Sequence, residues 1–137
     1  MWDVPEEVEA YREIASQASG EVLVVGYRLG IVQRVLCSNP EVSSVLTIEK
    51  LPEVIEECLR AIGSIHGSHK ICDFYEYTSD EKFDCVIGDI WLDYTREHID
   101  EYIRFKEKAK TFIKKNGKIL AWGQDYLEYL VSQSFKK

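Results

Sequence analysis

Short and mostly apolar runs recur along the chain and predict strands. Runs of four or five apolar residues are typical of strands that are buried on both faces of a parallel sheet. Residues 22–25 and 119–122 are wholly apolar, Thr47 interrupts the run at 45–48, and Asp84 interrupts the run at 83–87. Residues 69–72 form a weaker candidate strand. Glycine, proline, asparagine or acidic residues follow most of these runs, and such residues commonly end a strand or begin a turn.

Between these runs, apolar residues recur every three or four positions, which predicts amphipathic helices. The predicted helices cover Pro5 to about Ala18, Ile31 to Cys37, Pro52 to Ile62, Glu97 to Ile113 and a last segment after Asp125. Pro52 suits the first turn of its helix. The predicted buried stripe of that helix consists of Val54, Ile55, Cys58, Leu59 and Ile62. Asn116-Gly117 predicts a turn before the last strand.

Strands that alternate with helices predict an α/β fold with a mostly parallel sheet and helices on both faces. Right-handed crossovers leave few topologies for such a sheet. We expect one Rossmann-like domain over residues 1–137, with five strands in the order 3-2-1-4-5. Residues 1–19 would form an amphipathic helix packed on that domain, and the fifth strand would be an exposed edge. Because exposed edges tend to be paired or covered, we expect a homo-oligomer.

The chain of 137 residues carries a net charge of −7, which argues against nucleic acid as its main partner. Five lysines fall on one predicted helix and indicate a solvated face: Lys106, Lys108, Lys110, Lys114 and Lys115. No apolar run approaches the roughly 20 residues that span a membrane, and no signal peptide is visible, so we expect a cytoplasmic protein.

The cysteines and histidines predict neither disulfides nor a metal site. The cysteines, Cys37, Cys58, Cys72 and Cys85, form no CxxC pair and stand in apolar surroundings. We therefore expect buried free thiols in a reducing compartment. His66 and His69 have too few candidate ligands nearby for zinc, so we interpret them as loop histidines.

The strongest functional signal is the order strand, glycine turn, helix, strand and acid. Gly26 and Gly30 follow the first apolar run, and Glu49 ends the second. This order is typical of a nucleotide-binding βαβ unit. Gly26, Glu49, Asp73 and Asp89 all fall at predicted carboxyl ends of strands. Ligands of open α/β sheets bind at that edge.

Four motifs carry a resemblance to a known family. They are Val22-Leu23-Val24-Val25-Gly26-Tyr27-Arg28-Leu29-Gly30, Val45-Leu46-Thr47-Ile48-Glu49, Phe83-Asp84-Cys85-Val86-Ile87-Gly88-Asp89-Ile90-Trp91 and Asn116-Gly117-Lys118-Ile119-Leu120. Together they resemble the class I S-adenosylmethionine-dependent methyltransferases, most closely the spermidine-synthase-like branch. The resemblance extends from the first strand through the fifth.

This resemblance implies S-adenosylmethionine as cofactor and assigns roles to individual residues. The loop with Gly26, Tyr27, Arg28 and Gly30 would lie under the methionine part of the cofactor. Glu49 would hold the ribose, with Lys50 beside it. Asp73 and Phe74 would contact the adenine. Asp89, the candidate catalytic residue, would lie between cofactor and acceptor, and Trp91 and Tyr94 would face the acceptor.

The chain also departs from the family pattern. Arg28 stands where the family loop has its central glycine, and no sixth or seventh strand is predicted. Three functions remain open. The first is a small methyltransferase that acts on a small-molecule acceptor. The second is a non-catalytic binding or assembly module with an altered site, and the third is an aminopropyltransferase-like enzyme.

Overall fold

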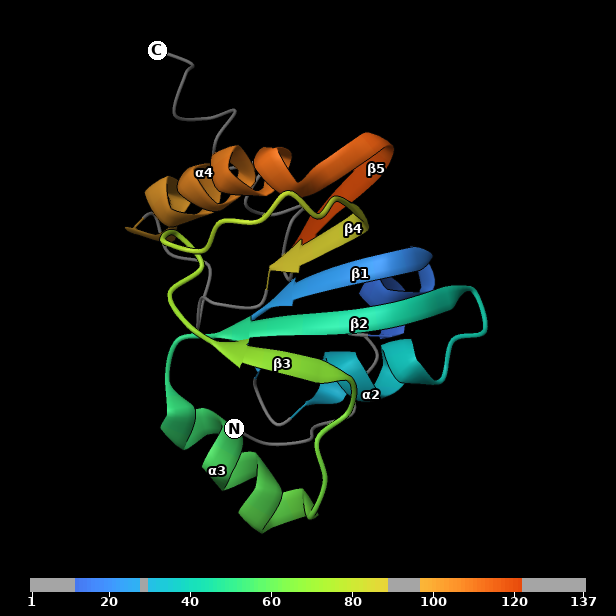
Figure 1. The fold of residues 1–137 in the computed structure, drawn as a ribbon, viewed down its shortest axis with the longest axis vertical. Coiled ribbons are helices and arrows are strands. Elements are labelled where there is room, and N and C mark those ends of the chain that lie inside the picture. The colour runs from blue at the N-terminus through green and yellow to red at the C-terminus, as the bar shows by residue number, and fades with distance from the viewer. Residues whose placement is uncertain (1–11, 28–29, 89–96, 122–137) are drawn as a thin grey trace.

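All four strand pairings of the sheet are parallel (Figure 1). The computed structural model describes residues 12–27, 30–88 and 97–121. Its strands are β1 Gly20–Val25, β2 Val42–Glu49, β3 Ser68–Ile71, β4 Phe83–Gly88 and β5 Ile113–Ala121. Its helices are α2 Ile31–Cys37, α3 Pro52–Ile62, α4 Glu97–Ala109 and the 3-10 helix η1 Lys110–Phe112.

The strand order is β3-β2-β1-β4-β5, which confirms the predicted topology. Val22 of β1 pairs with Val45 of β2 on one side and with Cys85 of β4 on the other. The apolar runs predicted from the sequence therefore form the three central strands. In this register the carboxyl ends of β1, β2 and β3 meet at one edge of the sheet.

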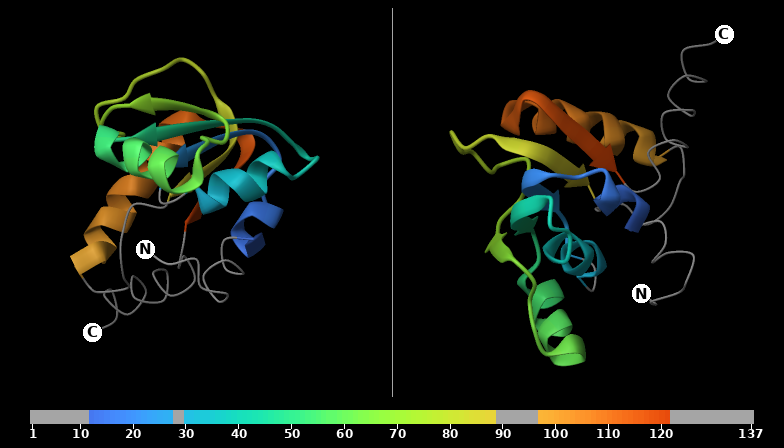
Figure 2. Two further views of the ribbon diagram at one scale, coloured as in Figure 1. Left: turned by 90° about the horizontal axis from the view of Figure 1, so that it is seen from below. Right: turned by 90° about the vertical axis from the view of Figure 1, so that its right-hand side faces the viewer.

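Two cores lie on opposite faces of the sheet, because successive side chains of a strand point to opposite faces. Leu23 and Val25 pack in one cluster with Phe105 of α4. Val22 and Val24 pack in the other with Leu36 of α2 and with Ala15 and Ala18. Residues 12–16 are helical and lie beside α2 (Figure 2). Helices therefore cover both faces, as predicted. The rest of the predicted N-terminal helix and the predicted helix after Asp125 lie outside the described residues.

The predicted boundary between the fourth helix and the fifth strand is wrong. The helix was expected to reach Ile113, but α4 ends at Ala109 and Ile113 is the first residue of β5. Phe83 pairs with Ile113 and Cys85 pairs with Lys118, so residues 114–117 all lie opposite Asp84 alone. The predicted Asn116-Gly117 turn therefore falls in this bulge, within β5. The five lysines predicted for one helix are therefore divided: Lys106 and Lys108 lie in α4, Lys110 lies in η1, and Lys114 and Lys115 lie in β5.

The bulge is tied to the amino-terminal end of the sheet by Asp84. Its Oδ2 atom accepts hydrogen bonds from the Glu21 backbone N–H at 2.8 Å and from Lys114 Nζ at 3.3 Å. The hydrogen bond from the Glu21 backbone is the largest cause that lowers the pKa of Asp84 below its ordinary value. Lys114 Nζ also lies 3.1 Å from Glu21 Oε2. These contacts join β1, β4 and β5 at the edge opposite the carboxyl ends.

Helix α3 buries only part of its apolar stripe. Ile55 and Cys58 pack against Tyr27, but Leu59 and Ile62 are 46% and 44% exposed. The prediction that Leu59 and Ile62 are buried is therefore wrong, because α3 extends past β3 away from the sheet (Figures 1 and 2). The strand β3 runs from Ser68 to Ile71, one residue earlier at each end than predicted. His69 therefore lies in a strand and not in a loop, whereas His66 lies in a loop as predicted.

The four cysteines are free thiols, as expected, but they differ in burial. Cys58 and Cys85 are buried, Cys72 is half-buried, and Cys37 is exposed, contrary to the prediction for Cys37. Among the described residues, no helix is long and apolar enough to cross a membrane. The same residues contain no group of three His, Cys, Asp or Glu side chains that could hold a metal ion.

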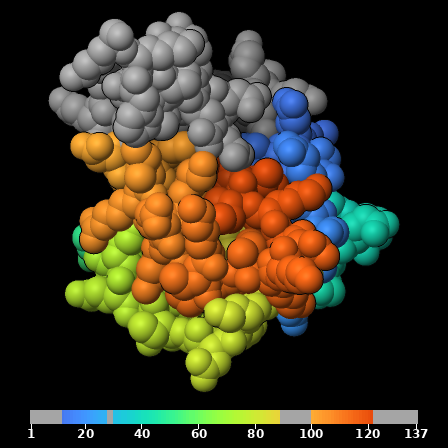
Figure 3. Space-filling view, turned by 90° about the horizontal axis from the view of Figure 1, so that it is seen from above, coloured from blue at the N-terminus to red at the C-terminus, as the bar shows by residue number. Residues whose placement is uncertain are grey.

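The edge strand β5 and helix α4 reach the surface at one end of the molecule (Figure 3). At the opposite edge, all four residues of β3 are exposed. Within the described ranges, each of these two strands pairs on one side only.

Candidate functional site

A cavity of about 760 Å³ opens at the carboxyl ends of β1, β2 and β3, and α4 forms its far wall. The described residues that line it are Val25, Gly26, Ile48, Glu49, Lys50, Leu51, Val54, Cys72, Asp73, Phe74, Tyr75, Asp100, Glu101 and Arg104. Five residues predicted to bind a cofactor are among them: Gly26, Glu49, Lys50, Asp73 and Phe74. The structure thus brings together residues that are up to 48 positions apart in the sequence, from 26 to 74.

Glu49 is held rigidly at the centre of this edge. Its Oε1 atom accepts a hydrogen bond from the Tyr27 backbone N–H, and its Oε2 atom accepts one from the Leu51 backbone N–H, each at 2.9 Å. The residue is only 8% exposed. An ionised carboxylate has about four acceptor positions, so two remain for the hydroxyls of a ligand. Glu49 therefore joins the β1–α2 loop to the end of β2 and still presents acceptors at the cavity.

Gly26 lies in a backbone conformation that favours glycine, with φ of 99°. Its N–H donates to the Ile48 carbonyl at 2.9 Å, and its own carbonyl accepts from Gln33 Nε2 at 3.1 Å. These bonds hold the turn after β1 against β2. A ligand in the cavity can therefore approach the main chain at this position.

Gln33 of α2 holds this loop, although none of the sequence motifs includes it. Its side chain is 1% exposed, and its Nε2 atom donates to Gly26 O and to Thr47 Oγ1, both at 3.1 Å. Gln33 occupies a position on the buried face of α2, where the helical period predicts an apolar residue. A glutamine at a position where the helical pattern calls for an apolar residue is a sequence signal for this role, because a buried polar side chain needs hydrogen-bond partners.

Replacing Gln33 with leucine is expected to lower the free energy of unfolding by about 1–3 kcal/mol. The change leaves Gly26 O and Thr47 Oγ1 without the donor that they have now, and a buried group without a partner costs about that much. Urea unfolding measures the effect. In the double variant Gln33→Leu/Thr47→Val the side-chain pair is replaced together, so part of the loss should return. A Gln33→Leu variant as stable as the wild type would contradict this role.

Tyr27 points away from the cavity, although the resemblance assigned it to the cofactor. Its side chain is fully buried against Ile55 and Cys58, and its hydroxyl accepts a hydrogen bond from the His66 backbone N–H at 3.0 Å. Burial raises the pKa of Tyr27 to about 12, so the phenol stays neutral. Only its backbone N–H reaches the site, through Glu49.

Gly30 makes room for the Tyr27 ring. A Cβ atom at Gly30 would lie 2.7 Å from the Tyr27 hydroxyl oxygen, and φ of Gly30 is 71°. Gly30 precedes α2 as its N-cap. Among the residues that the structure describes, neither Tyr27 nor Gly30 lines the cavity. The loop therefore uses Gly30 for internal packing, on the side away from Glu49.

Asp73 and its neighbours form the end of the cavity beyond Glu49. Asp73 Oδ1 accepts a hydrogen bond from the Tyr75 backbone N–H at 2.9 Å, and Asp73 Oδ2 lies 3.8 Å from Lys50 Nζ. Lys50 is largely exposed, so this ion pair contributes little to stability. Phe74 is buried in the core with Phe105 and Phe112. Burial raises the pKa of Cys72 above its ordinary value, which disfavours the thiolate there.

Four of the predicted site residues lie outside the described residues: Arg28, Asp89, Trp91 and Tyr94. Trp122, Gln124 and Asp125 lie at the end of the last predicted strand or just after it, where they would line the rim of the pocket, and they lie outside the described residues too. The predictions that Arg28 belongs to the cofactor loop and that Asp89 lies between cofactor and acceptor therefore stay predictions.

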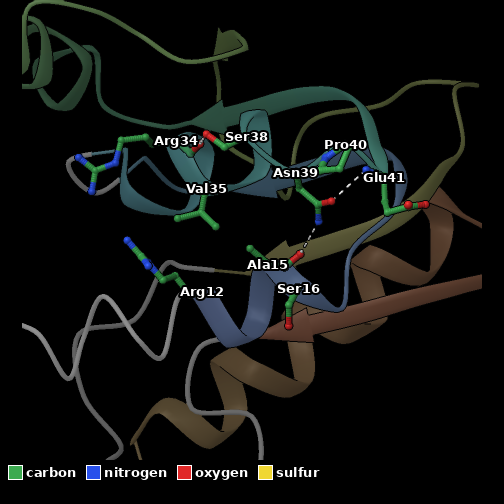
Figure 4. Close-up of a pocket in the computed structure, with 9 residues that line it drawn as sticks. All are labelled: Arg12, Ala15, Ser16, Arg34, Val35, Ser38, Asn39, Pro40 and Glu41. Atoms are coloured by element: carbon green, nitrogen blue, oxygen red, sulfur yellow. Dashed lines mark hydrogen bonds between the residues drawn. The ribbon is translucent and has the colours of Figure 1, made fainter.

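A second hollow, of about 650 Å³, lies between residues 12–16 and α2 (Figure 4). The guanidinium groups of Arg12 and Arg34 lie at one end of it, and Asn39 and Glu41 lie at the other. Asn39 Nδ2 donates to Ala15 O at 3.3 Å, and Asn39 Oδ1 accepts from the Glu41 backbone N–H at 2.9 Å. The first bond joins the helical residues 12–16 to the loop that follows α2, and the second lies within that loop. The hollow lies away from the carboxyl ends of the strands, where ligands of such sheets bind, so we interpret it as a gap between packed segments and not as the candidate site.

Comparison by sequence gives no assignment: no family model matches the chain, and no curated protein matches it. Comparison by structure gives many similar proteins. An S-adenosylmethionine-dependent methyltransferase from Clostridium acetobutylicum ATCC 824 aligns with a TM-score of 0.61 at 15% identity, over 86% of this chain and 50% of that one. The structure described as a DhpI-SAH complex aligns with a TM-score of 0.57 at 20% identity, over 82% of this chain and 65% of that one.

A third similar structure is the ribosomal protein L11 methylase from Lactobacillus delbrueckii subsp. bulgaricus. It aligns with a TM-score of 0.67 at 14% identity, over 96% of this chain and 69% of that one. This chain thus spans about half to two thirds of the length of these proteins. Identities at this level establish the fold alone. The chain has the Rossmann-like fold of the S-adenosylmethionine-dependent methyltransferases.

Proposed function

We propose that the protein binds S-adenosylmethionine in the 760 Å³ cavity and transfers its methyl group to a small-molecule acceptor. One observation carries the proposal. Gly26, Glu49 and Asp73 follow three adjacent parallel strands and line a single cavity, within a fold shared with methyltransferases. One of the similar structures is described as a complex with SAH, the demethylated product of this cofactor.

The cavity suits this cofactor in size and in chemistry. Small-molecule sites usually enclose about 300–1,000 Å³, and they combine apolar walls with a few fixed polar groups. Val25, Ile48 and Phe74 supply apolar wall. Glu49 supplies fixed acceptors for vicinal hydroxyls, and Asp73 supplies an acceptor at the end where a base amino group would lie. The amino-acid part of the cofactor would lie against the main chain at Gly26.

The chemistry that the cofactor supplies when bound is an activated methyl group on a sulfonium. The task of the protein is then to bind and orient, because holding two reactants in line supplies much of the rate. Glu49 would fix the ribose, since its carboxylate is locked by two backbone N–H groups. Glu49 in turn fixes the loop at Tyr27. We propose that Asp89, Trp91 and Tyr94 face the acceptor.

The finer assignments are also proposals. The four motifs favour the spermidine-synthase-like branch, and the −7 net charge disfavours nucleic acid as acceptor. The two edge strands, β3 and β5, offer surfaces for self-association. On the last ground we propose a homo-oligomer, and the free cysteines favour a reducing compartment such as the cytoplasm.

Methyl-labelled S-adenosylmethionine tests the acceptor class. Purified protein is incubated with the labelled cofactor and an extract of the source cells, and the products are separated on a membrane that retains macromolecules. The small-molecule fraction is then resolved by chromatography, because it also holds the unreacted cofactor. We expect a labelled compound other than the cofactor in that fraction. Glu49→Ala serves as the inactive control. New label confined to retained protein or nucleic acid would contradict a small-molecule acceptor, and no labelled product beyond that of the control would contradict methyl transfer.

A further inference from the structure

Arg104 of α4 stacks on Tyr75 at the far end of the cavity. The Cζ atom of Arg104 lies 3.9 Å from the centroid of the Tyr75 ring, and both residues line the cavity. This distance is typical of a guanidinium plane laid on an aromatic face. The motifs of the sequence do not include either residue, and no role has so far been assigned to the pair.

The Tyr75 ring has a fixed place. Its backbone N–H donates to Asp73 Oδ1 at 2.9 Å, and its ring meets the ring of Phe74 edge-on, with the centroids 5.5 Å apart. Burial raises the pKa of Tyr75 to about 12, so the ring carries no charge at neutral pH. Within the described part of the chain, the Tyr75 hydroxyl has no hydrogen-bond partner. Tyr75 thus acts through its ring face, which Arg104 covers.

The position of the pair follows the order of the strands. Gly26, Glu49 and Asp73 succeed one another from β1 through β2 to β3 along the cavity. A nucleoside whose ribose meets Glu49 and whose amino-acid part meets Gly26 has its base at the Asp73 end. Tyr75 and Arg104 close that end. Arg104 is exposed to solvent, and one face of its guanidinium lies on the Tyr75 ring. Arg104 lines the cavity at this end.

We propose that Arg104 is a specificity-determining residue, whose guanidinium, backed by Tyr75, forms a flat shelf for the adenine base of the ligand. The inference rests on the proposed function. An Arg plane stacks on π-systems on both of its faces, whereas the ammonium of Lys is a point charge without a plane. Charge alone therefore does not replace Arg104.

The test compares Arg104→Lys with wild-type protein by calorimetric titration with S-adenosylhomocysteine and with 5′-methylthioadenosine. The second ligand keeps the base and the ribose but lacks the amino-acid end. We expect Arg104→Lys to weaken both ligands by the same factor, about five- to tenfold. The ligand-free melting temperature should stay unchanged, since the side chain is exposed. Arg60→Lys is the matched control, because Arg60 is 70% exposed, pairs with Glu57 at 3.2 Å and does not line the cavity.

A double-mutant cycle tests the stack itself. Tyr75→Leu should weaken both ligands, and adding Arg104→Lys to it should cause little further loss, because the shelf is already gone. If Tyr75→Leu does not fold, Arg104→Lys alone decides. If Arg104→Lys binds both ligands with an affinity within twofold of the wild type, this inference is overturned and the proposed function stands. A loss for S-adenosylhomocysteine but not for methylthioadenosine would overturn it too. A wild-type protein that binds neither ligand would overturn the proposed function and this inference together.

Discussion

Replacing Glu49 with alanine is expected to weaken the binding of S-adenosylhomocysteine at least a hundredfold. Two ribose hydroxyls would lose a charged acceptor, and each hydrogen bond to a charged group contributes about 1.5–3 kcal/mol. The sum, about 3 kcal/mol or more, corresponds to a factor of a hundred or more. The backbone N–H groups of Tyr27 and Leu51 also lose the acceptor that positions them. Calorimetric titration of both proteins measures the ratio of the dissociation constants.

Two further variants separate binding from folding. Glu49→Gln keeps the size of the side chain but leaves one acceptor oxygen for two backbone donors, so it should also lose most of the affinity. Glu53→Ala, in the first turn of α3, removes an exposed acid that does not line the cavity and should bind as the wild type does. A folded Glu49→Ala protein with wild-type affinity would show that Glu49 only holds the loop.

Replacing Tyr27 with alanine is expected to lower the free energy of unfolding by about 3–5 kcal/mol. The ring is fully buried between the β1–α2 loop and α3, and truncating a buried aromatic residue costs about that amount. Gly30 cannot fill the space, since it has no side chain and its φ is 71°. Urea unfolding measures the effect.

Tyr27→Phe distinguishes the structural role of this residue from the cofactor role that the resemblance implied. It keeps the ring and removes only the hydroxyl that accepts from His66 N, which should cost about 1–2 kcal/mol of stability. Its affinity for S-adenosylhomocysteine should stay within about threefold of the wild type, because the ring lies outside the cavity and the backbone N–H still bonds to Glu49. A tenfold loss of affinity in a stable Tyr27→Phe protein would contradict this placement.

The central fold was predictable because its signals are local. The runs around Val24, Ile48 and Val86 form the three central strands. Right-handed crossovers leave few strand orders for them, and the family resemblance favours the order 3-2-1-4-5 among these. Gly26 and Glu49 were predictable for a related reason. The carboxyl ends of parallel strands meet at one edge, so a glycine and an acid at those ends must lie near each other.

The sequence failed where the outcome depends on packing between distant segments. The stripe of α3 has helical spacing through Ile62, but the sheet does not extend far enough to cover it. The bulge of β5 depends on pairing with β4 on both sides of Asp84, and a local pattern does not contain that register. Gln33 and Arg104 act through partners 7 to 29 positions away, so their roles emerge only from the folded chain.

Calorimetric titration of the wild-type protein with S-adenosylhomocysteine tests the central claim most directly. The account predicts one site per chain, with a dissociation constant in the micromolar range, because the cavity presents fixed acceptors at Glu49 and Asp73. A folded protein that shows no heat and no thermal stabilisation at millimolar ligand would contradict the claim. The fold would then serve a non-catalytic binding or assembly role, with a cavity that no longer takes the cofactor.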